Sequence, residues 1–129
     1  MFQSNEEQVI LAVVRGELAL NKLDTVGVFV VIIDSPGGKV CKVQSRTPIV
    51  VNITVVDIAK GLLALRFSQH ELMNWAVFIF ATDVIDMEQV HEHAQSEIVL
   101  DALWVAAFEG EVRKDAVDVL DNLIHQINT

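Results

Sequence analysis

Residues 54–82 contain two consecutive helical patterns, which constrain the fold more than any other part of the chain. In both, apolar residues recur every three or four positions, which places them on one face of a helix. The first set is Val55, Ile58, Ala59, Leu62 and Leu63, and the second is Leu72, Trp75, Ala76, Ile79 and Phe80. Ser68 and Glu71 have the spacing of a capping box, which starts a helix. The stretch therefore predicts two helices joined by a short corner.

The ends and the surroundings of these two helices are also predicted. Thr54 suits the N-cap of the first helix, and Asp57 suits its first turn, where the helix dipole favours an acid. The second helix has further apolar residues on its other face, which is typical of a central helix. We expect Trp75 to be an anchor in the core, because a large indole is usually buried.

The first third of the chain predicts a helix followed by a small sheet. Ser4 and Glu7 form another capping box, and an apolar stripe continues to about Leu20. Residues 25–33 are rich in β-branched side chains, and residues 39–44 are the expected return strand. The turn at 34–39 contains Pro and two Gly residues, so a β-hairpin is predicted. Residues 47–53 are either a third strand or a continuation past a bulge.

The last third predicts helices around an acidic connection. Residues 83–95 are acidic and irregular, with room for one short helical turn. A helix starts at Ser96 and ends at Gly110, and a final helix covers about 113–127. The expected buried stripe of the Ser96 helix is Leu100, Leu103, Trp104, Ala107 and Phe108. The fold class is therefore α+β in one domain, 1–129: an N-terminal helix, a small antiparallel sheet of two or three strands, and about four C-terminal helices.

Charge is strongly segregated along the chain. Residues 1–66 hold six acids and seven bases, whereas residues 67–129 hold twelve acids and two bases. No Lys or Arg occurs from 67 to 112. An acidic field repels nucleic acid and attracts basic proteins or cations. We expect a protein partner at the acidic connection, through Asp83, Asp86, Glu88 and Glu92. The alternative is a solubilising face that offsets a very apolar interior.

Composition narrows the class of protein. The hydrophobic fraction is 52% and the mean hydropathy is +0.42, which favours a filled core and a surface for self-association. The longest apolar run, 26–33, is far shorter than the roughly 20 residues that a bilayer requires. Cys41 is the single cysteine and so forms no intrachain disulfide. We expect a cytoplasmic protein that spans no membrane and has no cofactor.

His91-Glu92-His93 is the cluster whose residue types best suit a metal ion, and Glu88 lies nearby. In an extended segment the two histidines would share one face and bind a metal jointly. In a helix they would diverge, and Glu88 would become the partner of His91. The spacing matches no specific zinc motif. No histidine has an evident Ser or Cys partner for a catalytic triad, so we expect no enzyme.

One resemblance covers the C-terminal two thirds. It begins at Asp57 and continues through Ser68-Gln-His-Glu-Leu and Asn74-Trp-Ala. An acidic segment follows, and then Leu103-Trp104 to Phe108-Glu109. This order of segments resembles small bacterial helical proteins of the toxin-immunity or inhibitor kind. The first helix and the hairpin lie outside the resemblance. It implies a chain that binds and neutralises a toxic partner, typically a basic nuclease. The alternatives are a small metal- or ligand-binding protein using His91 and His93, and a self-associating structural subunit.

Overall fold

The computed structural model describes residues 5–20, 22–23, 28–35, 38–45, 50–81 and 84–127, of which 5–6, 28–35, 38–45, 81 and 126–127 are described by their backbone alone. The elements found in these ranges are α1 (Asn5–Val14), β1 (Val28–Ser35), β2 (Gly38–Ser45), β3 (Val51–Asn52), α2 (Val55–Leu65), α3 (Gln69–Ala81), β4 (Ile85–Asp86), α4 (Glu88–Glu92), α5 (Ser96–Glu109) and α6 (Lys114–Ile127). Helices make up most of the described chain, and the α+β class is observed.

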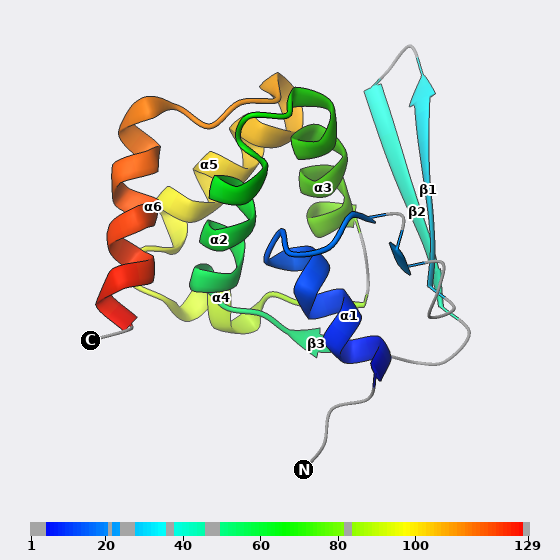
Figure 1. The fold of residues 1–129 in the computed structure, drawn as a ribbon, viewed down its shortest axis with the longest axis horizontal. Helices are drawn as coiled ribbons and strands as arrows, with labels where there is room; N and C mark the ends of the chain where they lie inside the picture. Colours follow the sequence, from blue (N-terminus) through cyan, green and yellow to red (C-terminus); the bar gives the residue numbers. More distant parts are fainter. Residues whose placement is uncertain are drawn as a thin grey trace.

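The helices form a bundle with the hairpin at one edge (Figure 1). β2 packs against α3, α3 packs against α5, and α6 lies at the opposite edge against α2. α2 also contacts α1, α3 and α5, so it is the central helix of the bundle. α3 lies between the hairpin on one side and α2 and α5 on the other, which agrees with its two apolar faces.

The strands form two separate pairs. β1 pairs antiparallel with β2, from Val28 opposite Ser45 to Ser35 opposite Gly38, and residues 36–37 of the turn lie outside the described ranges. The prediction that 47–53 joins this sheet is wrong for its described part, because β3 pairs in parallel with β4. Val51 N–H donates to the Val84 carbonyl at 2.8 Å, and Ile53 N–H donates to the Asp86 carbonyl at 3.3 Å. Parallel strands need a long crossover, and α2 with α3 supplies it.

α2 begins as predicted and buries the predicted face. Thr54 Oγ1 accepts from the Asp57 N–H at 3.3 Å, and the Asp57 carboxylate accepts from the Thr54 N–H at 2.9 Å, which completes a capping box. Of the predicted stripe, Val55, Ile58, Ala59 and Leu62 are fully buried, and Leu63 packs partly buried against the core. This burial is the main source of the helix's stability, because most helices this short are only marginal on their own.

Trp75 ties α3 to the end of α1. Its side chain is 2% exposed, which confirms the predicted core anchor. The indole N–H lies 3.1 Å from the Val13 carbonyl and 3.2 Å from the Val14 carbonyl, so it donates to the last turn of α1. Gly61 of α2 faces the same place, where a Cβ atom would meet the Val14 carbonyl oxygen and the Trp75 ring. Three helices therefore approach closely at one glycine.

α1 ends at Val14, earlier than the stripe to Leu20 predicts. Gly16 adopts a φ of 76°, in the left-handed region that favours glycine. Its N–H donates to the Val13 carbonyl at 3.1 Å, and the Glu17 N–H donates to the Ala12 carbonyl at 2.9 Å. These two bonds are the Schellman motif that terminates helices. The predicted cap at Ser4 lies outside the described residues.

The last two helices have the predicted positions, but the buried face of α5 differs. Its buried residues are Val99, Ala102, Leu103 and Ala106. Trp104 and Phe108, which we expected in the core, are exposed. Small side chains at Ala102 and Ala106 let α5 approach its neighbours closely, which an indole there would prevent. In α6, Leu120 and Leu123 are buried and Asp115, Asp118 and Asp121 are exposed.

Candidate functional site

The acids predicted to bind a partner flank α4. Glu88 and Glu92 are exposed at its two ends, and Asp83 lies outside the described residues. Asp86 is half-buried, and its carboxylate accepts from the Glu88 N–H at 2.8 Å. An acid at this place satisfies one of the free N–H groups at a helix start. Asp86 therefore has a structural role at the start of α4, whereas Glu88 and Glu92 are free to meet a partner.

The two histidines face different surroundings. His91 lies in α4 and is exposed, whereas His93 follows the helix in extended backbone and is half-buried. His93 Nδ1 accepts from the Gln95 N–H at 3.0 Å, which occupies one of its ring nitrogens. Among the residues that the structure describes, no three His, Cys, Asp or Glu side chains gather as a metal site requires. The metal hypothesis stays a prediction without support from this arrangement.

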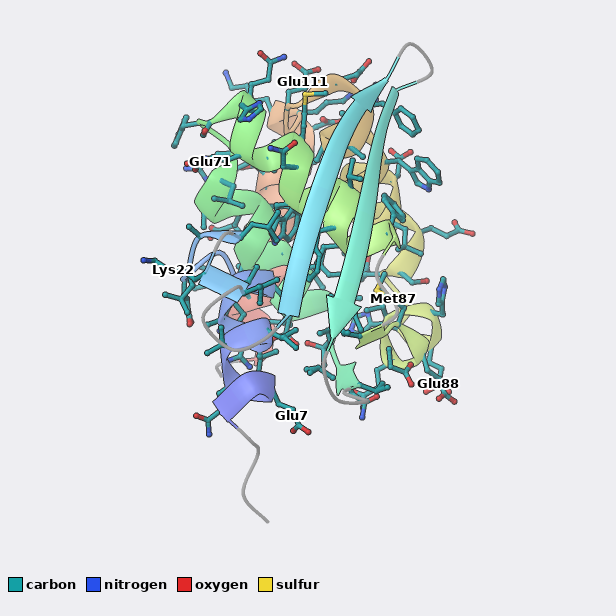
Figure 2. The ribbon with its side chains drawn as sticks, turned by 90° about the vertical axis from the view of Figure 1, so that its right-hand side faces the viewer. Glu7, Lys22, Glu71, Met87, Glu88 and Glu111 are labelled. Atoms are coloured by element: carbon teal, nitrogen blue, oxygen red, sulfur yellow. The ribbon has the colours of Figure 1, made fainter. Side chains whose placement is uncertain are left out.

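Exposed carboxylates cover much of the described segment between α3 and α6. Glu71, Glu88, Glu92, Glu97, Asp101, Glu109 and Glu111 are exposed. Of these seven carboxylates, that of Glu109 forms an ion pair within the described chain, at 3.7 Å from Arg113. Figure 2 shows Glu71 and Glu111 toward one end of the molecule and Glu88 toward the other. The acidic character therefore extends across the surface, and little of it is neutralised by bases whose side chains the structure describes.

Three aromatic side chains form an exposed ladder on α3 and α5. Phe80 and Trp104 have ring centroids 4.5 Å apart with planes tilted by 36°. Trp104 and Phe108 have centroids 5.0 Å apart and nearly parallel planes, 2° from each other. Their exposed fractions rise along the ladder, from 36% for Phe80 to 48% for Trp104 and 69% for Phe108. We call Phe80, Trp104 and Phe108 the aromatic ladder.

The ladder was missed in the sequence because its helical spacing is that of a core stripe. Trp104 and Phe108 are four residues apart and share a face of α5. Glu97 and Asp101 precede them at the same spacing and are also exposed. One face of α5 thus has two carboxylates followed by two aromatic rings. The exposed acid Asp101, in register with Trp104 and Phe108, was the available signal that this face meets solvent.

An open groove runs beside this face, between α5 and α6. Its volume is about 570 Å³. Apolar residues such as Ala102, Val105 and Val119 line it, and its charged residues are the acids Glu97, Asp101 and Asp115 and the base Arg113. The groove therefore combines an apolar floor with three acids and one base.

A second hollow lies at the start of α2, and its one carboxylate, that of Asp57, is already paired. It has a volume of about 380 Å³ and is lined in part by Arg15, Asp57, Lys60 and His93. Arg15 Nε donates to Asp57 Oδ1 at 2.8 Å, and Asp57 also accepts from Thr54. Asp57 is 6% exposed and is the one buried charged residue among those whose side chains the structure describes. These bonds satisfy the carboxylate, so the group is a brace between α1 and α2.

Comparison with known proteins adds no relative. No protein-family model matches the chain, and no match is found among curated proteins or among solved structures. Within the described ranges, each helix is too short or too polar to cross a bilayer.

Proposed function

We propose that this chain is a non-enzymatic protein-binding module whose acidic C-terminal half recognises a basic protein surface. One observation carries the proposal. The carboxylates in the described part of 67–112 are largely exposed. Within the described chain, one of these exposed carboxylates, that of Glu109, is paired with a base. Their field therefore acts outward, where it raises the rate of encounter with a positively charged partner and disfavours other acidic proteins.

The resemblance to toxin-immunity and inhibitor proteins gives this proposal a finer form. In that form the partner is a basic toxic protein such as a nuclease, and binding in the cytoplasm blocks its activity. A basic nuclease must itself attract phosphate, so an acidic surface is suited to occupy its binding site.

A capture experiment at two salt concentrations tests the proposal. The immobilised chain is exposed to bacterial lysate at about 50 and 500 mM NaCl, since screening by salt weakens interactions between exposed charges. A variant with Glu88→Gln, Glu92→Gln, Glu97→Gln and Asp101→Asn removes four exposed acids. Asp86 is left intact because its carboxylate caps α4.

A control removes two exposed acids of α6 that do not line the groove, with Asp118→Asn and Asp121→Asn. We expect a basic protein to be captured by the unaltered chain and by the α6 control, to be released at high salt, and to be lost by the four-acid variant. The captured protein, once purified, should lose its activity when the chain is added if the inhibitor form holds. Equal capture by all three chains, or capture of nothing basic, would contradict the proposal.

A further inference from the structure

The aromatic ladder is a cluster of exposed apolar side chains that lies outside the core. α5 buries Val99, Ala102, Leu103 and Ala106, so its packing is complete without Trp104 and Phe108. Aromatic residues together with Arg are enriched at the centres of protein interfaces, where a few of them supply most of the binding energy. Three exposed rings in mutual contact are therefore suited to anchor a partner.

The charges beside the ladder determine which partner side chain suits it. Asp101 lies one helical turn before Trp104, and Glu97 lies one turn before Asp101. Both are exposed, and neither has an ion pair within the described part of the chain. A second copy of this chain carries the same net charge of −9, so its approach to these carboxylates is electrostatically unfavourable. A cation is attracted by the same carboxylates.

Among cationic side chains, arginine fits an aromatic face best. Its guanidinium is planar and weakly hydrated, and it stacks on aromatic rings, whereas the lysine ammonium is a compact and strongly hydrated charge. The chain already contains one such contact, in which Arg66 Cζ lies 4.6 Å from the centroid of the Phe67 ring. Phe108, at 69% exposed, offers the most accessible ring of the ladder.

We propose that the aromatic ladder of Phe80, Trp104 and Phe108, with Asp101 and Glu97 beside it, docks a basic protein segment by stacking an arginine side chain of that segment. The proposal rests on the proposed function and names the chemistry of its partner. Asp101 and Glu97 supply attraction to any basic segment, and the rings supply the preference for arginine over lysine.

Two peptides of equal charge separate these contributions. The probes are decapeptides of alternating Arg and Ala and of alternating Lys and Ala, titrated into the chain by calorimetry at about 50 mM NaCl, with Trp emission followed in parallel. We expect the arginine peptide to bind about 2- to 5-fold more tightly, the range that a cation–π contact at an exposed site supplies. Trp104→Leu and Phe108→Leu should each bring this ratio close to one while affinity for the lysine peptide is retained.

Control variants locate the effect. Phe67→Leu changes an exposed ring outside the ladder and should keep the ratio, and Asp118→Asn on α6 should change neither affinity. Asp101→Asn should weaken both peptides alike. Far-UV circular dichroism checks that each variant folds, which we expect because the ladder residues lie outside the core.

The outcomes distinguish this inference from the proposed function. If both peptides bind equally and the four-acid variant loses both, the acidic surface binds basic proteins and the arginine site is wrong. A ratio that Trp104→Leu and Phe108→Leu leave unchanged also overturns the arginine site, as does binding of neither peptide. Sedimentation equilibrium addresses the remaining occupant: a dimer that Trp104→Leu dissociates would make the ladder a self-association surface and overturn the proposal.

Discussion

Gly61 lies where α2 meets the end of α1 and the ring of Trp75, so its missing side chain is a packing requirement. Alanine there would gain about 1 kcal/mol from helix propensity. Its Cβ, however, would meet the Val14 carbonyl oxygen and the Trp75 ring together. Overpacking of a filled core typically costs about 1–3 kcal/mol. Because Trp75 is also held by its bonds to α1, we expect Gly61→Ala to lower the free energy of unfolding by a net 1–2 kcal/mol or so, measured by urea denaturation.

The neighbouring substitution Lys60→Ala provides the control for Gly61→Ala. It changes the same helix at a half-exposed position, and we expect it to alter stability by less than about 0.5 kcal/mol. A Gly61→Ala protein as stable as the unaltered chain would mean that α1 and Trp75 do not pack closely against α2 at this position.

The brace between Arg15 and Asp57 makes a second prediction at the residue scale. Asp57→Ala removes the reciprocal cap of α2 and the partner of Arg15, and we expect a loss of about 2–3 kcal/mol in the free energy of unfolding. Arg15→Met leaves Asp57 with its bonds from Thr54, so we expect a loss of about 1 kcal/mol. The two changes together should cost less than their sum, because both remove one interaction. Additive losses in this double-mutant cycle would show that the pair contributes nothing.

An exposed acid supplies the reference for that cycle. Glu111→Gln removes one negative charge from a loop, and we expect a change below about 0.5 kcal/mol. A loss as large as that of Asp57→Ala would show that net charge, rather than the brace, accounts for the effect.

Residues whose roles depend on local spacing could be predicted from the sequence, and those whose roles depend on distant contacts could not. Thr54 and Asp57 are three positions apart, and Trp75 lies within a periodic stripe, so their cap and core roles were readable. Arg15 and Asp57 are 42 positions apart, and no local pattern connects them. The same holds for Gly61, whose neighbours come from α1 and α3.

At the scale of elements, α5 shows why periodicity alone does not determine which face of a helix is buried. Between Ile98 and Phe108 the single polar residue is Asp101, so several faces of the helix are apolar enough to be buried. The predicted stripe and the observed one share Leu103 and the same spacing, and they differ by about one position. Asp101 decides between them, because a buried face centred near Trp104 would desolvate its carboxylate.

Truncations on the two faces of α5 should therefore differ in cost. Leu103→Ala opens a cavity in the core and should lower the free energy of unfolding by about 2–5 kcal/mol. Phe108→Ala removes an exposed ring and its stacking on Trp104, so we expect a loss below about 1 kcal/mol. Thermal or urea unfolding of both variants measures the difference. Similar losses would mean that the ladder is part of the core.

The hairpin and the parallel strand pair were predictable to different degrees. Eight-residue strands around a Pro-Gly-Gly turn have a strong local pattern, and β1 with β2 lies where it was expected. β3 and β4 have two residues each, which is too short for any alternation to be visible. Their pairing depends on α2 and α3 bringing both ends together, and the acidic residues around β4 suggested a loop.

At the scale of the whole molecule, the chain combines an apolar core with a net charge of −9. Like charges also face one another along the helices, at Glu88 with Glu92, Glu97 with Asp101, Asp115 with Asp118, and Asp118 with Asp121, all of them exposed. Each such neighbour at three or four positions destabilises a helix by about 0.2–0.5 kcal/mol. Under the proposed binding function, a basic partner would neutralise the carboxylates that repel one another in the free chain, and binding would remove this destabilisation.

Salt should therefore stabilise the free chain. Raising NaCl from about 10 to 300 mM shortens the Debye length from about 30 Å to less than 10 Å, which screens exposed carboxylates from one another. Summed over the four neighbouring pairs, we expect the free energy of unfolding to rise by about 1–2 kcal/mol. Urea is the suitable denaturant, since guanidinium is itself a salt.

A triple variant removes a charge from each of the four pairs, with Glu92→Gln, Asp101→Asn and Asp118→Asn. It should be more stable than the unaltered chain at low salt, and its free energy of unfolding should depend less on salt. A midpoint that falls with salt would mean instead that attractive ion pairs dominate the surface, and the outward acidic field on which partner binding rests would then be largely compensated within the chain.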